Sequence, residues 1–332
     1  MLARLQSQIP DAPGWVYEPK WDGFRAIVFR DGKSIHIASR NELPLERYFP
    51  ELVDALPAAL EERCVVDGEI VIAGDKGLDF DALQLRIHPA ASRVKMLSQT
   101  RPAVFIAFDI LARGDLDLRS LPYIERQRHL LEAVRPGERV RLTPQTEDDE
   151  MARNWFQRFE GAGFDGVVAK PRESAYVSGE RLMVKVKHQR TVDCVVGGYR
   201  VGAAGASPGS LLLGLYDGAG VLHYAGHTSS FSAAERVNVM EKIKPFEGGE
   251  SFGMGRAPGG PSRWSHGRET TWVTLRPELV CEVSFDHLQG NRFRHASRFL
   301  RWRPDKNPQQ CTYDQLEPPG PFALDDVLAM GR

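Results

Sequence analysis

Lys20, in the segment EPKWDGFRA, offers the most reactive chemistry in this sequence. It is followed closely by Asp22, Gly23 and Arg25. A lysine amine attacks phosphorus only after it loses a proton, so its reference pKa of about 10.4 has to be lowered by burial or by nearby positive charge. A single lysine beside an Asp-Gly turn is more often an ordinary surface residue. The segment therefore predicts a nucleophile only if partner residues occur elsewhere.

Such partners recur along the chain in short segments. In MVKVK, Lys185 and Lys187 alternate with valines, which predicts two ammonium groups on one face of a strand. Such a pair would lower the pKa of a nearby lysine and neutralise phosphate charge in a transition state. Taken singly, such residues also fit structural roles, for example core packing for Phe108. The other segments contribute Ser39 and Arg40 in SRNE, Asp67 and Glu69 in VVDGEIV, Phe108 and Asp109 in AFDIL, Asp165, Gly166 and Lys170 in FDGVVAK, and Arg303, Asp305 and Lys306 in RWRPDK.

Strands and helices are expected to alternate in the first half of the chain. Residues 23–39 form two alternating segments around Asp31 and Gly32, which predicts a hairpin because an Asp-Gly pair tolerates the positive φ of a type I′ turn. Apolar residues at helical spacing predict helices over 44–62, interrupted at Pro57, over 121–134 with Ser120 as a candidate N-cap, and over 148–160. Together these elements predict a mixed α and β domain.

The pattern changes after about residue 189. Short strands with glycine-rich turns follow, with little helix between them, which indicates a small β-barrel. Residues 248–267 are rich in glycine and proline and predict a long loop within this second domain. We therefore expect one domain over residues 1–189 and an all-β domain over residues 190–332.

The composition is that of an ordinary globular protein. The 332 residues are 42% hydrophobic and 26% charged, which fits two domains with cores of their own. Four widely separated cysteines form no CxxC pair, which argues against a structural zinc site and a disulfide scaffold. No apolar segment has the length of a membrane span or of a signal peptide. A cytoplasmic, nucleoid-associated location without membrane contact is the expectation.

Charge is distributed unevenly despite a formal net charge of −1. Residues 291–306 carry six basic side chains opposed only by Asp305, whereas residues 147–150 are all acidic. A solvated strand face and a nucleic-acid contact both explain such a basic segment, and charge patterning alone does not separate them.

The ordered series of segments resembles the nucleotidyltransferase motifs I, Ia, III, IIIa, IV, V and VI of the ATP-dependent DNA ligases. The resemblance runs from about Glu18 to Lys306, and RFLRWRPDKNPQQCT is most similar to the short bacterial ligases related to mycobacterial ligase C and to the ligase module of ligase D. It implies an α+β nucleotidyltransferase (adenylation) domain of antiparallel sheets and helices, followed by an all-β OB-fold domain.

The resemblance also implies a role for each matching residue. Lys20 would attack the α-phosphate of ATP and carry AMP as a phosphoramidate. Glu18 would read the adenine, and Phe108 would stack on it. Phosphate and ribose would be held by the remaining nucleotide-binding residues, which are Arg25 and Glu69 at the ribose hydroxyls, Arg40 at a phosphate, Lys170 in motif IV, and the catalytic pair Lys185 and Lys187 at the α-phosphate. Arg303, Asp305 and Lys306 would orient the pyrophosphate when the second domain closes.

A divalent ion is expected at the triphosphate, because Mg²⁺ binds carboxylate and phosphate oxygens. Glu69 and Asp165 are the candidate ligands of Mg²⁺, or of Mn²⁺ in its place. Asp165 departs from the longer glutamate that many ligases have there. Glu42, where glycine is common, and Met183, where an aromatic residue is common, are the other departures.

The resemblance implies a monomer that seals nicks in double-stranded DNA, in repair, with a repair polymerase or an end-binding protein as partner. The loop at residues 248–267 is a candidate clasp on the DNA. An RNA ligase or a capping guanylyltransferase is the nearest alternative, and a non-catalytic OB-containing module is a more distant one. An NAD-dependent ligase is disfavoured, since zinc-binding cysteines and extra domains are missing.

Overall fold

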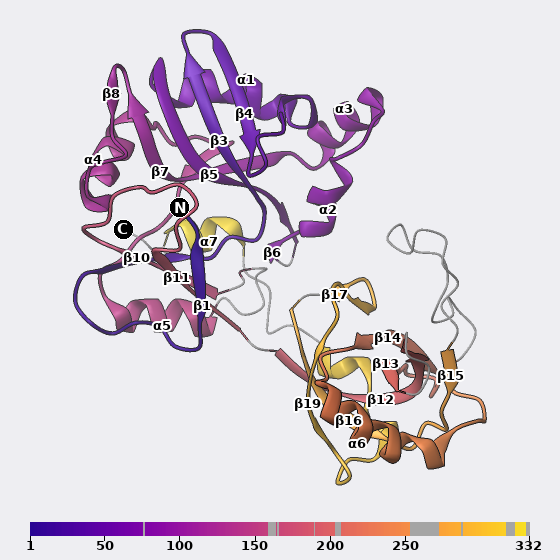
Figure 1. The fold of residues 1–332 in the computed structure, drawn as a ribbon. Coiled ribbons are helices and arrows are strands. Elements are labelled where there is room, and N and C mark those ends of the chain that lie inside the picture. The colour runs from indigo at the N-terminus through magenta and orange to yellow at the C-terminus, as the bar shows by residue number, and fades with distance from the viewer. Residues whose placement is uncertain are drawn as a thin grey trace. The chain divides into compact units, whose positions relative to one another are not determined.

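A computed structural model describes residues 1–75, 77–158, 164, 166–188, 190–202, 207–252, 272–286, 288–316 and 323–329. The chain divides into two compact units, Met1–His188 together with Pro318–Arg332, and Gln189–Glu317 (Figure 1). The expected second domain ran from 190 to the C-terminus. The structure instead assigns the residues from Pro318 onward to the first unit.

The smaller sheet of the first unit has four strands in the order β1-β11-β10-β2. β10 lies antiparallel to both β2 and β11, and β1 adds to β11 in parallel. The buried face of this sheet packs Tyr17, Val167 and Val186 against Ala152. The bounds are β1 (Ala3–Gln6), β2 (Trp15–Pro19), β10 (Gly166–Pro171) and β11 (Met183–Lys187).

The larger sheet has seven strands, with β4-β3-β5-β7-β8 as its main path. β3 and β4 form the expected hairpin, in which Asp31 pairs with Ser34. The predicted type I′ turn is wrong, however, because Gly32 has a φ of 59° while Lys33 does not have a positive φ, which fits type II′. The bounds are β3 (Phe24–Asp31), β4 (Ser34–Ser39), β5 (Arg63–Gly74), β6 (Gly77–Leu78), β7 (Ala103–Arg113), β8 (Leu116–Asp117) and β9 (Val140–Leu142).

Helices cover this larger sheet and differ in detail from those expected. The helix predicted over 44–62 is a short η1 followed by α1, which tolerates Pro57 near its C-terminal end. Pro122, and not Ser120, is the N-cap of α4. Two helices, α2 and α3, were not predicted. The bounds are η1 (Glu46–Tyr48), α1 (Pro50–Ala59), α2 (Phe80–Leu85), α3 (Ala91–Thr100) and α4 (Tyr123–Ala133). The remaining helix of this unit before β10, α5 (Asp149–Arg158), packs instead on the smaller sheet, against β2 and β10.

The last helix, α7 (Leu324–Leu328), packs on the first unit, among its strands in Figure 1. Val327 is fully buried in a small apolar cluster that includes Trp21 and Trp155. Trp21 directly follows Lys20, and its indole nitrogen donates to Thr143 Oγ1 at 2.9 Å. The segment after Lys20 is therefore anchored by burial as well as by hydrogen bonding.

The second unit is built on a sheet in the order β14-β13-β12-β16-β19. An isolated bridge between Thr228 and Ser297 brings the end of β14 to the start of β19, as closure of a barrel requires. One helix, α6 (Ala233–Ile243), begins at a capping box formed by Ser232 and Glu235 and was not predicted. The strands are β12 (Arg190–Val201), β13 (Pro208–Tyr216), β14 (Leu222–Thr228), β15 (Trp272–Thr274), β16 (Val280–Phe285), β17 (Leu288–Gln289), β18 (Arg292–Phe293) and β19 (Arg298–Trp302), with η2 (Lys244–Phe246), η3 (Pro308–Gln310) and η4 (Tyr313–Leu316).

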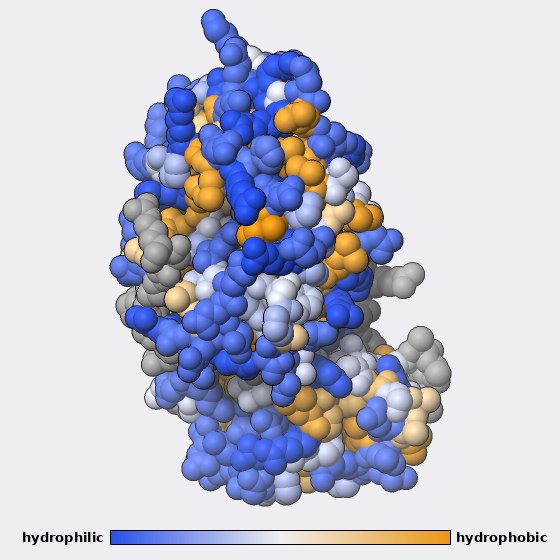
Figure 2. Space-filling model, turned by 90° about the vertical axis from the view of Figure 1, so that its left-hand side faces the viewer, coloured by the Kyte–Doolittle hydropathy of each residue, from blue (hydrophilic) through white to orange (hydrophobic). Residues whose placement is uncertain are grey.

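No helix in the described part of the chain is both long and apolar enough to cross a membrane. On the face drawn in Figure 2, hydrophilic residues cover most of the surface and apolar residues lie in small separate groups. Such scattered groups are usual on protein surfaces and do not mark a docking site by themselves.

Candidate active site

The three lysines predicted for catalysis lie on β11 and directly after β2, the two strands that flank β10 in the smaller sheet. Lys20 follows β2 directly, and its backbone N–H donates to the carbonyl of Gly166 at 2.9 Å. Gly166 in turn pairs with Lys187, and Val168 with Lys185. Residues directly opposite in an antiparallel sheet share a face, so this register puts Lys20 and Lys187 in one row, roughly 10 Å apart across β10.

Two glycines allow the close backbone approaches on which this row depends. Gly166 has a φ of 139°, and a Cβ there would lie 1.9 Å from the carbonyl oxygen of Val186. A Cβ at Gly23 would lie 2.2 Å from the carbonyl oxygen of Ile70 on β5. The glycine of the K-x-D-G segment is thus needed to bring the turn after Lys20 against the larger sheet.

Glu69 is the carboxylate of the larger sheet that interacts electrostatically with Lys20. Burial raises the pKa of Glu69 to about 8, although the positive charges of Lys20 and Arg25 oppose the shift. Arg25 and Glu69 are directly opposite each other on β3 and β5. The predicted ribose pair therefore shares one face of the larger sheet, and Glu69 lies within reach of the charge of Lys20.

Arg25 is held by a carboxylate for which the sequence predicted no role. Its guanidinium donates to both oxygens of Asp67, at 3.0 and 2.6 Å, and also to the carbonyl of Met1 at 2.6 Å. Although burial lowers the pKa of Arg25, Asp67 raises it above its ordinary value. Tyr176 donates to the same carboxylate at 2.8 Å. Asp67, which is fully buried, thus fixes Arg25 beside the Phe108 ring, 5.7 Å from its centroid.

Glu18 and Phe108, the predicted adenine residues, are joined by one ammonium group. Lys170 Nζ donates to Glu18 Oε1 at 2.8 Å and to the backbone carbonyl of Phe108 at 3.2 Å. It also lies 4.6 Å from the centroid of the Phe108 ring. Burial raises the pKa of Glu18, while Lys170 and a hydrogen bond from Tyr123 oppose the shift. Since Lys170 and Glu18 are both almost completely buried, each stabilises the charge of the other.

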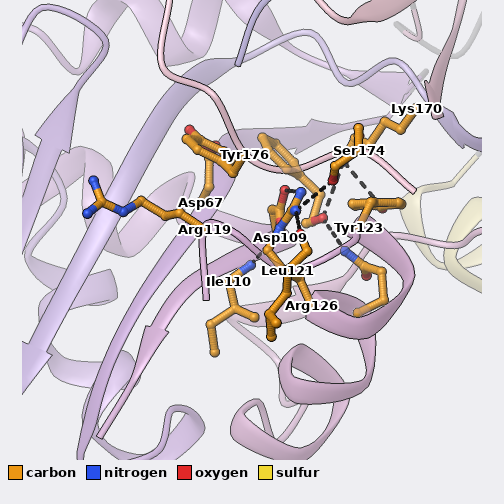
Figure 3. Close-up of polar contacts among 12 residues, drawn as sticks. Asp67, Asp109, Ile110, Arg119, Leu121, Tyr123, Arg126, Lys170, Ser174 and Tyr176 are labelled. Atoms are coloured by element: carbon orange, nitrogen blue, oxygen red, sulfur yellow. Dashed lines mark hydrogen bonds and ion pairs between the residues drawn. The ribbon is translucent and has the colours of Figure 1, made fainter. Parts of the chain in front are cut away.

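A second buried ion pair holds the chain segment that follows β10. Arg126 on α4 donates to both oxygens of Asp109 on β7, at 2.8 and 2.9 Å. The same guanidinium donates to the carbonyl of Ser174 at 2.9 Å. Figure 3 shows these residues converging with Tyr176 and Asp67. Segments far apart in sequence are thereby tied together beside the predicted nucleotide site.

The three residues predicted to orient pyrophosphate lie together in the second unit. Arg303 donates to Asp193 at 2.9 and 3.1 Å and to Asp305 at 2.8 Å, and Lys306 lies 3.7 Å from Asp193. Hydrogen bonding from Arg303 lowers the pKa of Asp305 to about 2. The sequence did not single out Asp193. The side-chain amide of Gln315 anchors its backbone: the Asp193 N–H donates to Gln315 Oε1, and Gln315 Nε2 donates to the Asp193 carbonyl, at 3.2 Å each.

The structure describes only some of the remaining predicted residues. Arg40 is exposed and follows Ser39, which pairs with Ala26 next to Arg25. Asp165 lies outside the described residues, as do residues 253–267 of the predicted loop. Glu42 has a φ of 59°, which explains why glycine suits this position.

Two family models match this arrangement of sheets and barrel. The ATP dependent DNA ligase domain matches residues 1–187, and the ATP dependent DNA ligase C terminal region matches residues 204–306. The chain belongs to the ATP-dependent DNA ligases. The predicted family and the predicted nucleotidyltransferase and OB-fold architecture are thus confirmed.

Individual relatives agree with this family. The chain is similar to DNA ligase C1 of Mycolicibacterium smegmatis, with 49% identity over 338 residues that cover 99% of this chain and 96% of that protein. It is 30% identical over 308 residues to the multifunctional non-homologous end joining DNA repair protein LigD of Mycobacterium tuberculosis, covering 90% of this chain and 37% of that protein. A solved structure from a study of Lig E DNA ligases matches with a TM-score of 0.55 at 19% identity, over 91% of this chain and 99% of that chain, and supports the fold alone.

Proposed function

We propose that this chain seals nicks in duplex DNA through a covalent lysyl-AMP intermediate on Lys20. The row formed by Lys20, Gly166 and Lys187 carries the proposal. It aligns a candidate nucleophile with a cation that would neutralise the α-phosphate as charge develops. Phosphoryl transfer depends mainly on such positioning and electrostatics.

Three transfers would complete the reaction. The neutral Nζ of Lys20 attacks the α-phosphorus of ATP, a P–N bond forms, and the P–O bond to pyrophosphate breaks. An oxygen of the 5′-phosphate at the nick then attacks the phosphorus of AMP and releases Lys20. Finally the 3′-hydroxyl loses its proton and attacks the activated 5′-phosphorus, and AMP leaves. In the first transfer, Arg303 and Lys306 would hold pyrophosphate, with Asp193 and Asp305 positioning Arg303.

The described residues fit a magnesium ion held largely by its substrate. They contain no group of three side chains able to hold a metal, but Glu69 is a half-buried carboxylate beside Lys20. Mg²⁺ commonly takes one or two carboxylates together with phosphate oxygens and water. Glu69 would hold it there, and the bound ion would neutralise triphosphate charge. Asp165, the other predicted ligand, lies outside the described residues.

The second unit would supply DNA contacts through part of its basic segment. Arg301 pairs with Glu282 at 2.6 Å, and Arg303 with Asp193, so these two are already bound to carboxylates. Arg298 is exposed on β19 and is a better candidate for a phosphate contact. Phe293 and Phe299 belong to the core of the barrel. Replacing Arg298 by alanine should weaken nick binding and lower its salt dependence.

The wider cellular role extends this proposal. We place the protein in DNA repair as a cytoplasmic, nucleoid-associated monomer that acts with a repair polymerase or an end-binding protein. The presence of a multifunctional end-joining repair protein among its relatives supports the repair role. Light scattering in the absence of DNA tests the monomer directly, since a stable dimer would have twice the mass.

Transfer of radiolabel from α-labelled ATP to the protein tests the activity. Wild type and Lys33→Ala, a control at an exposed lysine of the hairpin turn, should both become labelled. Lys20→Ala should remain unlabelled. Labelling from GTP in preference to ATP would favour the guanylyltransferase alternative, and labelling of Lys20→Ala would overturn the assignment of the nucleophile.

A further inference from the structure

A closed ring of hydrogen bonds connects the two residues predicted to hold the adenine base. On one side, Lys170 joins the Phe108 carbonyl to Glu18 Oε1, at 3.2 and 2.8 Å. On the other side, Gln127 Nε2 donates to the Phe108 carbonyl at 2.9 Å, and Gln127 Oε1 accepts from Gln145 Nε2 at 2.6 Å. Gln145 Nε2 closes the ring by donating to Glu18 Oε1 at 3.1 Å.

The ring permits only one orientation of its two amides. A backbone carbonyl can only accept, so Gln127 must turn its NH₂ group toward Phe108 and its oxygen toward Gln145. Gln145 must then present its own NH₂ group, whose two N–H protons are shared among Gln127 Oε1, Glu18 Oε1 and, at 2.8 Å, Tyr123 Oη. Because Tyr123 accepts from Gln145, its single proton is left for Glu18. Lys170, Tyr123 and a shared N–H of Gln145 therefore fix the position of Glu18 Oε1.

Burial makes this arrangement costly to disturb. Glu18 is 2% exposed, Gln127 is 5% exposed and Tyr123 is fully buried. Tyr123 and Gln127 are four residues apart on α4, so both project from one face of that helix toward Glu18. A buried polar group without a partner costs free energy, so each member of the ring constrains the others.

We propose that Gln127 and Gln145 are positioning residues that hold the Glu18 carboxylate in the orientation that selects adenine over guanine. This inference rests on the proposed function, because it assumes that the base of ATP meets Glu18. Within the described residues, no hydrogen bond ends on Glu18 Oε2. In a fixed direction, that oxygen accepts from the 6-amino group of adenine, whereas guanine presents a second oxygen at this position and is repelled.

Methionine substitutions test the inference, because methionine keeps the length of glutamine and removes its amide. The variants are Gln145→Met, Gln127→Met and the double variant, with Gln157→Met on the exposed face of α5 as the control. The measurements are KM and kcat for self-adenylylation by ATP, and the ratio of label taken from ATP and from GTP. Gln145→Asn, which keeps an amide but shortens its reach, serves as a second variant at this position.

Gln145→Met and Gln145→Asn should raise KM for ATP and reduce the preference for ATP over GTP by about threefold to tenfold, the range of one lost hydrogen bond. Their kcat at saturating ATP should stay within about twofold of wild type, because the chemistry at Lys20 is untouched. The double variant should be no worse than the more impaired single variant, since Gln127 acts through Gln145.

Unchanged KM and nucleotide preference in both Gln145 variants would overturn the inference, as would a loss confined to kcat. A failure of the proposed function looks different, because wild type itself would then take no label from ATP. If the losses of ATP preference in the two single variants add up in the double variant, the inference is also contradicted. Gln127 and Gln145 would then act independently and not as one connected pair.

Discussion

The backbone N–H of Lys20 donates to the carbonyl of Gly166 at 2.9 Å, which places the candidate nucleophile opposite a residue without a side chain. Lys187 pairs with Gly166 from the other side. This single glycine therefore sets the separation between the nucleophile and a cation that would neutralise the α-phosphate. The lysines gain their chemistry from the register of three strands, and not from any one segment.

Gly166→Ala should lower both stability and activity. The new Cβ would lie 1.9 Å from the Val186 carbonyl oxygen, at a φ of 139° that L residues rarely adopt. We expect a loss of about 1–3 kcal/mol in the free energy of unfolding, typical of overpacking, and a slower transfer of AMP. Urea denaturation and label transfer measure the two effects. Gly137→Ala is the control, because a Cβ there meets nothing within 4 Å.

Glu69 should make the protein less stable as the pH rises. The unfolded state releases the proton of Glu69 near 4.5, whereas the folded state retains it up to a pKa of about 8. Between these values the folded state binds more protons, so wild type should lose up to about 1.4 kcal/mol per pH unit relative to Glu69→Gln. Urea denaturation at pH 5 to 8 measures this difference. A difference independent of pH would contradict the raised pKa.

Wild type and the Glu69→Gln variant also test metal binding. If Glu69 holds Mg²⁺, adding the ion at pH 8 in the presence of a non-hydrolysable ATP analogue should stabilise wild type more than Glu69→Gln, because a ligand stabilises only the state that binds it. Chelation should reverse the gain. Equal stabilisation of both proteins would place the ion elsewhere.

Glu42→Gly should stabilise the protein. Glu42 is the one non-glycine residue with a positive φ in the described part of the chain, and a left-handed conformation costs an L residue about 1–2 kcal/mol. Glycine loses more chain entropy on folding, so we expect a net gain of less than about 1 kcal/mol. Thermal unfolding measures it. Glu62→Gly, at another exposed glutamate, should give no gain.

Arg303→Ala should slow AMP transfer from ATP about tenfold or more, since it removes a cation proposed to hold the leaving group. It should also cost about 1–3 kcal/mol of stability, because Asp193 is left buried without its main partner. Adding Asp193→Asn should restore stability but not the rate. Recovery of both would show that Arg303 has only a structural role.

The sequence predicted what depends on strand patterns and short segments. Alternation in MVKVK predicted that Lys185 and Lys187 share a strand face, and the register of β10 and β11 agrees. Side-chain contacts between distant elements escaped prediction. Gln127 and Gln145 lie on a helix and in a connection, and nothing local indicates that their amides meet. The packing of Val327 in α7 beside Trp21 likewise depends on tertiary structure alone.

The most direct test of the central claim is to locate the AMP adduct by peptide mass spectrometry after incubation with ATP and Mg²⁺. We predict one AMP per chain, on the peptide that contains Lys20, and no adduct at Lys185 or Lys187. An adduct on either of those lysines, or a protein that forms no adduct while still sealing nicked DNA with ATP, would contradict the assignment of Lys20 as the nucleophile.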